Sequence, residues 1–257
     1  MGREEMSLVA KKHVIKKENE LGVEIRNSAK ASTVFNGQAD AIAALNSSVR
    51  TTPCEVILMD ADSVTAAFAA GRGRTCILNF ASYKHPGGGF LHGMMAQEEA
   101  LCHVSNLFNI LRMFDNVYYG ANRAELNRGL YKHRALYTPS VIFDSVGGRT
   151  AAFDVLTCAA PNWSAAGRYG RVTREENDAV MHERIAFMLS SMANGNPDTI
   201  VLGAWGCGVF KQDPIKVATS MRYWLEKLNV GTRIILAIPG ATSKNYKAFE
   251  SVFAEVL

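Results

Sequence analysis

Short runs of apolar residues, many of them β-branched, recur along this chain and alternate with stretches whose apolar residues return at helical spacing. Runs that are apolar throughout are typical of strands buried on both faces of a parallel sheet. The predicted strands are Glu55–Met59, Thr75–Phe80, Val141–Phe143, Phe153–Ala159, Thr199–Ala204 and Arg233–Ile238.

Helical signals lie between these strands. Thr173 with Glu176 three residues later has the pattern of a capping box, and Asp213 followed by Pro214 is typical of a helix start. Helices are predicted over Ala96–Met113, from Thr173 to about Met192 just before Asn194-Gly195, from Asp213 onward, and from about Ser243 to the last residue. Strands that alternate with helices indicate an α/β fold in which helices cover a largely parallel sheet.

The chain shows no repeat, low-complexity tract or clear linker, and its 257 residues suit one large domain. The simplest interpretation is a single structural domain in which residues 1–50 form an N-terminal helical extension packed on a core of residues 51–257. Residues 114–140 lack a regular pattern and are rich in Tyr, Asn and Arg. Because so long a connection inside a compact domain is often functional, this segment is a candidate for shaping a site.

Charge and composition narrow the class of protein. The 28 basic and 24 acidic residues give a net charge of +4. This mild excess suits an anionic ligand such as a phosphate ester, whereas general nucleic-acid binders usually show clustered Lys and Arg. The sequence has no signal-peptide core and no apolar run of 18 residues, so we expect neither secretion nor membrane association.

The five cysteines are scattered and form no Cys-x-x-Cys pair, which favours free thiols in a reducing, cytoplasmic compartment. The six histidines show no His-x-x-x-His spacing and no zinc-type cluster with cysteine, so neither a metal nor a cofactor is expected. A monomer is the simplest expectation, although the sequence leaves the oligomeric state open.

The segment from Asn79 to Cys102 is the most informative part of the chain. After the strand that ends at Phe80, Pro86 is followed by three glycines and then by a helix whose first turn carries Gln97-Glu98-Glu99. Glycines between a strand and a helix can cradle a diphosphate, because backbone N–H groups and the helix dipole favour negative charge there. Taken alone, the glycines also fit a plain loop, and the acidic pair fits simple preference for a helix start.

A second glycine-rich turn follows another predicted strand. Gly203-Ala-Trp-Gly206-Cys-Gly208-Val-Phe210 precedes the helix start at Asp213. In a parallel sheet both turns lie at the carboxyl edge, where ligands of such folds bind. Two facing cradles suit a diphosphate, and Phe210 could stack on a base or cover a ribose.

These residues resemble a known family, the microbial-type poly(ADP-ribose) glycohydrolases of the macrodomain superfamily. The spacing of Pro86-Gly-Gly-Gly, seven residues and Gln97-Glu-Glu matches its signature without gaps. The segments LNFAS, LYTPSVIF, CAAPNW and GAWGCGVFKQDP are similar to further family segments, so the likeness covers roughly residues 75–214. The resemblance implies a three-layer α/β/α macrodomain with a mixed, largely parallel central sheet, which binds ADP-ribose.

The resemblance also implies roles for individual residues. Glu99 would be the general acid/base, and Glu98 would hydrogen-bond a ribose hydroxyl near the bond that is cut. The substrate-binding residues implied in this way are Asn79, Gly87, Gly88, Gly89, Phe90, Gln97, Gly206, Cys207, Gly208, Val209 and Phe210. A carboxyl shielded by ligand and next to a second carboxylate has a raised pKa, which would let Glu99 protonate a leaving oxygen.

Two departures from the family pattern concern substrate preference. Lys84-His85 precedes Pro86 where Asn directly before the proline is usual, and His92 replaces a small residue in the spacer. Either change could alter how the terminal ribose or the leaving group is received.

The sequence therefore predicts a poly(ADP-ribose) glycohydrolase that releases ADP-ribose from polymer carried on modified protein or nucleic acid. Release of a single ADP-ribose from an acceptor by the same fold remains open, as do a non-catalytic ADP-ribose-binding module and exo- versus endo-cleavage. A dinucleotide-dependent oxidoreductase is disfavoured because the Gly-x-Gly-x-x-Gly fingerprint is absent. Cys207, between glycines near a helix start, is a weaker candidate for a nucleophile.

Overall fold

The computed structural model describes residues 2–37, 55–71, 73–144, 147–228 and 233–255. Its strands are β1 Thr33–Asn36, β2 Glu55–Met59, β3 Thr75–Phe80, β4 Arg134–Asp144, β5 Thr150–Cys158, β6 Thr199–Leu202 and β7 Arg233–Ala237. Its α-helices are α1 Arg3–Ala31, α3 Ser63–Ala69, α4 Gln97–His103, α5 Leu107–Leu111, α6 Gly120–Ala124, α7 Trp163–Tyr169, α8 Arg174–Ala193, α9 Pro214–Leu228 and α10 Lys244–Phe253.

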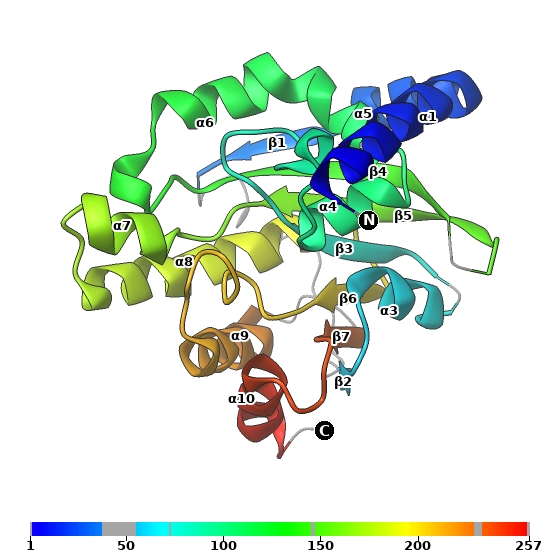
Figure 1. Ribbon diagram of the computed structural model, residues 1–257. Helices are drawn as coiled ribbons and strands as arrows, with labels where there is room; N and C mark the ends of the chain where they lie inside the picture. The colour runs from blue at the N-terminus through cyan, green and yellow to red at the C-terminus, as the bar shows by residue number, and fades with distance from the viewer. Residues whose placement is uncertain (1, 38–54, 72, 145–146, 229–232, 256–257) are drawn as a thin grey trace.

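One mixed sheet runs through the molecule (Figure 1) in the order β1-β4-β5-β3-β6-β7-β2. The five strands from β5 to β2 pair in parallel, whereas β4 lies antiparallel to both β5 and β1. The predicted largely parallel α/β sheet is therefore confirmed. The antiparallel pairs at one side make it mixed.

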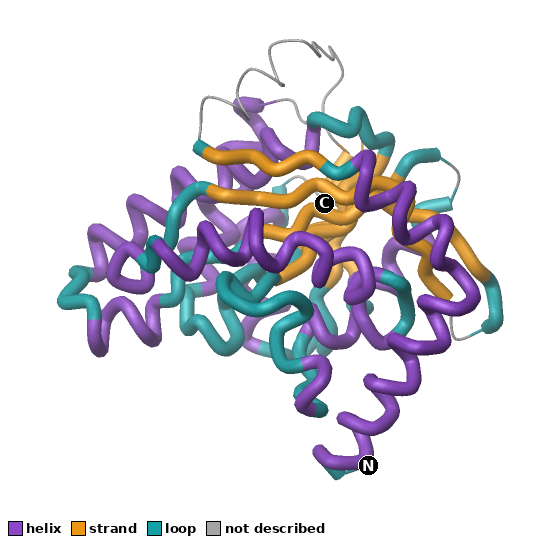
Figure 2. The backbone as a smooth tube through the Cα atoms, turned by 90° about the horizontal axis from the view of Figure 1, so that it is seen from above, coloured by secondary structure: helices purple, strands orange, loops and turns teal. Residues whose placement is uncertain are grey.

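Helices cover both faces of this sheet and give the three layers. Alternate residues of a strand point to opposite faces, so Leu78 of β3 joins a core with α8, α9 and α10. Its neighbour Ile77 joins the core formed with α1, α3, α4 and α5. Seen from above (Figure 2), the helices flank the strands along their length.

The local cap signals form as the sequence predicts. The Thr173 hydroxyl accepts a hydrogen bond from the N–H of Glu176 at 3.1 Å and starts α8. The Asp213 carboxylate accepts from the N–H of Ile215 at 2.9 Å at the start of α9, and Ser243 caps α10. These helices begin where predicted because capping involves only neighbours in the chain.

The predicted helix over Ala96–Met113 is wrong as a single element, because it is divided into α4 and α5. Residues between them pair with the end of β4: Ser105 bridges Phe143, and the N–H of Asp144 donates to Val104 at 2.8 Å. This pairing across the chain interrupts the helix while the apolar spacing continues through it.

Two further predictions need correction. The strand predicted over Val141–Phe143 is the end of the eleven-residue β4, so part of the irregular segment 114–140 is strand. The N-terminal segment is helical only to Ala31, after which β1 pairs with β4 at the edge of the main sheet. The boundary at residue 50 lies outside the described residues.

Candidate active site

Loops that follow β2, β3, β5, β6 and β7 meet at the carboxyl edge of the parallel strands, as predicted for ligand sites in such folds. They enclose two connected hollows. The larger is a cleft of about 1280 Å³ that both Glu98 and Glu99 line. The smaller is a pocket of about 490 Å³ lined by Gln97 and the second glycine loop. Phe80, Ala96, Val209 and Phe210 line both, so the two hollows meet at these residues.

The first glycine loop is packed tightly against the carboxyl pair. Gly88 has a φ of +60°, and a Cβ there would lie 2.6 Å from Oε1 of Glu99 and 2.9 Å from Oε2 of Glu98. A side chain on Gly87 would meet Phe108 at 2.6 Å, and one on Gly89 would meet Met94 at 2.3 Å. The two carboxyl groups thus converge on Gly88, which only glycine can occupy without displacing them.

The backbone amides of this loop are already engaged. The N–H of Gly88 donates to the carbonyl of His85 at 3.0 Å, and that of Phe90 donates to Gly87 at 3.0 Å. The N–H of Gly89 donates to Oε1 of Glu99 at 2.8 Å. The expectation that these amides would point unpaired at a ligand is therefore wrong for this loop, which instead positions the carboxylates.

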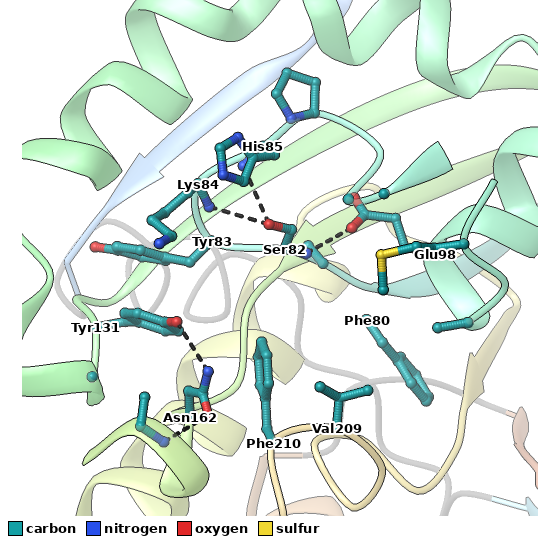
Figure 3. Close-up of a pocket in the computed structure, with 18 of the residues that line it drawn as sticks. Phe80, Ser82, Tyr83, Lys84, His85, Glu98, Tyr131, Asn162, Val209 and Phe210 are labelled. Atoms are coloured by element: carbon teal, nitrogen blue, oxygen red, sulfur yellow. Dashed lines mark hydrogen bonds between the residues drawn. The ribbon is translucent and has the colours of Figure 1, made fainter. Parts of the chain in front are cut away.

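Glu98 is 3 % exposed and is held on two sides. Its Oε2 accepts the N–H of Ser82 at 2.7 Å (Figure 3), and its Oε1 accepts from Nδ2 of Asn79 at 3.3 Å. Burial raises the pKa of Glu98 to about 8, partly offset by these hydrogen bonds, and the neighbouring Glu99 raises it further. The raised pKa in the structure thus belongs to Glu98, whereas the sequence-based expectation named Glu99.

Glu99 is 5 % exposed and accepts two backbone hydrogen bonds. Besides Gly89, the N–H of Ala96 donates to its Oε2 at 3.0 Å, which ties the carboxyl group to the N-terminus of its own helix α4. Its side chain is thereby fixed between the glycine loop and the first turn of the helix.

Asn79 and Gln97 support the loop and the two glutamates through hydrogen bonds inside the protein. Asn79 is fully buried and donates to Glu98 and to Oγ1 of Thr157 at 3.2 Å, and it does not line either hollow. Gln97 accepts the N–H of Phe80 at 2.8 Å and donates to the carbonyl of Leu78 at 2.9 Å. Both polar ends of Gln97 and the Nδ2 of Asn79 are thus bonded within the protein, whereas the buried Oδ1 of Asn79 has no hydrogen-bond partner in the described chain. Both side chains support the site from beneath it.

The second glycine loop is more open. Gly206 has a φ of +78° and packs against Gln212, whereas a Cβ on Gly208 would meet nothing within 4 Å. Val209 is 68 % exposed. Within the described part of the chain, the amides of Gly206, Gly208, Val209 and Phe210 donate no hydrogen bond. Unengaged amides next to a cleft are what an anionic group needs.

Not every residue implied by the resemblance reaches the cleft. Phe90 is fully buried among His13, His103 and Phe108, so its side chain belongs to the core. Gly87 lies beneath the loop, against Phe108. Cys207 packs against the core, and burial raises its pKa to about 12, which disfavours a nucleophilic thiolate.

The sequence did not single out one wall of the larger cleft. Tyr83 and Tyr131 stack with centroids 4.0 Å apart, and Tyr131 meets Phe210 edge-on at 6.2 Å. Figure 3 shows these rings opposite Glu98. Asn162 donates to the hydroxyl of Tyr131 at 3.4 Å. Asn162 belongs to the CAAPNW segment, which was a usable signal, whereas Tyr131 comes from the irregular segment 114–140.

Some features of the described residues bear on other classes of function. They contain no group of three or more His, Cys, Asp or Glu side chains arranged to hold a metal ion. No helix among them is long and apolar enough to cross a membrane. Cys76, Cys102, Cys158 and Cys207 are free thiols, and Cys54 lies outside the described residues.

The geometry agrees with the sequence family of the chain. The family model "Microbial-type PARG, catalytic domain" matches residues 2–144, a segment that contains the first glycine loop and both glutamates. The chain belongs to this family. Among curated proteins, none matches the chain.

Solved members of the family share the fold over nearly the whole length. The poly(ADP-ribose) glycohydrolase of Thermomonospora curvata is 25 % identical, with a TM-score of 0.86 over 99 % of this chain and 100 % of that one. Its complex with the inhibitor ADP-HPD is 26 % identical, with a TM-score of 0.83 over 99 % and 100 %. The Deinococcus radiodurans enzyme bound to ADP-ribose is 27 % identical, with a TM-score of 0.83 over 91 % and 98 %.

Proposed function

We propose that this PARG-family glycoside hydrolase releases ADP-ribose from poly(ADP-ribose) by cutting the ribose–ribose O-glycosidic bond, with Glu99 as the acid/base. The observation that carries the proposal is the convergence of two buried carboxyl groups on Gly88, at the floor of the cleft. The solved relatives bind ADP-ribose or ADP-HPD, which supports the same ligand class here.

The two hollows suggest how the ligand lies. The smaller pocket is lined by apolar groups such as Val64 and Pro239 and suits the adenosine. The diphosphate would then meet the unengaged amides of Gly206 and Gly208–Phe210. This places the distal ribose in the larger cleft, over Gly88 and beside Glu99.

Cleavage follows from this placement. The bond from the anomeric carbon to the leaving oxygen breaks with its electron pair on oxygen, which takes a proton from Glu99. The ribose becomes oxocarbenium-like, and the diphosphate held by the second loop stabilises its positive charge. Water then attacks the anomeric carbon and gives its proton to the Glu99 carboxylate, which restores the acid.

Glu98 has a different role in this proposal. With a pKa near 8 it is largely protonated at neutral pH, so it can donate a hydrogen bond to a ribose hydroxyl as well as accept one. Asn79 and the N–H of Ser82 fix its orientation. It would therefore bind and orient the reacting sugar while Glu99 transfers the proton.

We further propose that the polymer is carried on modified protein or nucleic acid, and that the enzyme acts as a monomer in a reducing, cytoplasmic compartment. The free thiols of the described cysteines support the reducing environment.

The test uses purified protein with poly(ADP-ribose) and with mono-ADP-ribosylated protein, followed by chromatography of the products. We expect free ADP-ribose from the polymer, with turnover falling at least about 10³-fold in Glu99→Gln while ADP-ribose binding is retained. Release from the mono-modified substrate alone would assign a mono-ADP-ribosyl hydrolase. Binding without release from either substrate would leave a non-catalytic module.

A further inference from the structure

The end of the larger cleft away from the smaller pocket is lined by cations. Lys84, Arg128 and Arg171 all line it and are exposed. Within the described chain, the side chains of Lys84 and Arg171 form no hydrogen bond or ion pair, whereas Arg128 pairs with Glu176. Of the acidic residues that the structure describes, Glu98, Glu99 and Asp115 line the cleft, and Asp115 is paired with Arg123 at 2.8 Å. This end therefore offers positive charge to an anionic group.

This cationic end lies on the leaving side of the bond that is cut. The proposed function, on which this inference rests, places ADP-ribose across the smaller pocket and the second glycine loop, with its distal ribose at Glu99. Whatever is attached to the leaving oxygen must then continue into the rest of the larger cleft. That cleft, at about 1280 Å³, is far larger than one remaining sugar requires.

An aromatic wall lines the same end. Tyr131 is fixed by its stacking on Tyr83 and by the hydrogen bond from Asn162 (Figure 3). Farther out, Tyr169 is 78 % exposed and presents a ring to solvent. Exposed aromatic rings next to cations suit a nucleoside diphosphate, because the base can stack while the phosphates meet the charges.

The backbone holds the two arginines in place at this rim. Arg128 and Arg171 both adopt left-handed conformations, with φ values of +55° and +50°. Their two turns pack closely on each other, since a Cβ on Gly170 would lie 2.2 Å from the carbonyl oxygen of Arg128. Non-glycine residues keep such conformations only where the surrounding structure enforces them. The backbone that carries these two arginines is thus preformed.

We propose that Lys84, Arg128 and Arg171, together with Tyr169, form a subsite for the ADP-ribose unit on the leaving side of the scissile bond. The cations bind its diphosphate and the tyrosine stacks on its base. The enzyme accordingly favours a polymer over a single ADP-ribose on an acceptor.

The test compares two substrates in the full-length protein. One is poly(ADP-ribose), and the other is ADP-ribose joined through its distal anomeric oxygen to p-nitrophenol, whose leaving group cannot reach the rim. In Lys84→Ala/Arg171→Ala we expect KM for the polymer to rise about tenfold, with kcat nearly unchanged, and its salt dependence to weaken. The fall in kcat/KM should be much larger for the polymer than for the p-nitrophenyl substrate.

The matched control is Lys12→Ala/Arg26→Ala, which removes the same two charges from the exposed side of α1, away from both hollows. Equal KM values in the rim variant and the control would overturn the subsite. Equal losses on both substrates would also overturn it, because they would show a general effect on ADP-ribose. A selective loss with mono-ADP-ribosylated protein instead would assign the rim to the acceptor. Failure of the wild type to cut the polymer would instead refute the proposed function.

Discussion

The two glycine loops of the site look alike in sequence but differ physically. In the loop at Gly87–Gly89 the amides of Gly88, Gly89 and Phe90 are already bonded, and a side chain at any of the three glycines would collide with a neighbour. In the loop at Gly206–Phe210 four amides are unengaged within the described chain, and Gly208 has open space around it.

This difference assigns the loops separate tasks. The first is a rigid support whose glycines let the backbone approach Glu98 and Glu99 closely enough to orient them. The second leaves its amides unengaged where it lines the two hollows, as the proposed binding of the diphosphate requires. A glycine-rich turn between strand and helix therefore does not by itself indicate a phosphate cradle, because packing decides whether its amides are free.

The largest effect expected from this comparison concerns Gly88→Ala against Gly208→Ala. The new Cβ at Gly88 would meet both carboxyl oxygens at under 3 Å, in a left-handed conformation that costs alanine about 1–2 kcal/mol. We expect kcat to fall about 100-fold or more. Gly208→Ala should keep kcat, with any loss confined to weaker ADP-ribose binding. Steady-state kinetics and calorimetric titration with ADP-ribose measure both, and similar kcat losses in the two variants would contradict the division of tasks.

The same comparison shows what the sequence can and cannot predict. Strands such as Thr75–Phe80 and starts such as Thr173 were predicted because burial patterns and caps depend on neighbours in the chain. The engagement of the Gly89 amide was not predictable, since its partner Glu99 is brought to it by the packing of the loop on α4. The aromatic wall was missed because the left-handed conformation of Tyr131 has no sequence signature.

A smaller effect, on the pH dependence of stability, is expected from the buried carboxyl group of Glu98 beside the first loop. The Glu98 side chain ionises near pH 4.5 when unfolded and near pH 8 when folded. Its contribution to stability is therefore fully present below pH 4.5 and is lost as the pH rises to about 8. Glu98→Gln removes this loss. The difference in Tm between this variant and the wild type should therefore increase by several degrees in favour of the variant from pH 5 to pH 9. This corresponds to a difference in the free energy of unfolding on the order of a few kcal/mol.

Calorimetry at a series of pH values measures this difference. The exposed Glu175→Gln serves as the control, because it removes a carboxyl without removing a buried one. A Tm difference between Glu98→Gln and the wild type that stays constant with pH would show that Glu98 is not the group whose protonation the fold favours.

The smallest effect is expected from removing a contact between the helix α1 and the first glycine loop. The helix α1 lies against the turn that follows the glycines: the Ser7 hydroxyl donates to the carbonyl of Leu91 at 2.6 Å, and a Cβ on Gly93 would lie 2.0 Å from the carbonyl oxygen of Arg3. Ser7→Ala should lower stability by about 1 kcal/mol, a Tm decrease of about 2–4 °C, and reduce kcat several-fold.

Ser251→Ala is the matched control, because its hydroxyl also donates to a backbone carbonyl, that of Ala248 at 2.9 Å, but far from the site in α10. It should leave kcat unchanged. If Ser7→Ala lowers Tm but also leaves kcat unchanged, α1 stabilises the fold without positioning the loop. A fall in kcat confined to Ser7→Ala would instead show that the N-terminal helix is part of the machinery that orients the two glutamates, whereas the second loop needs no such support.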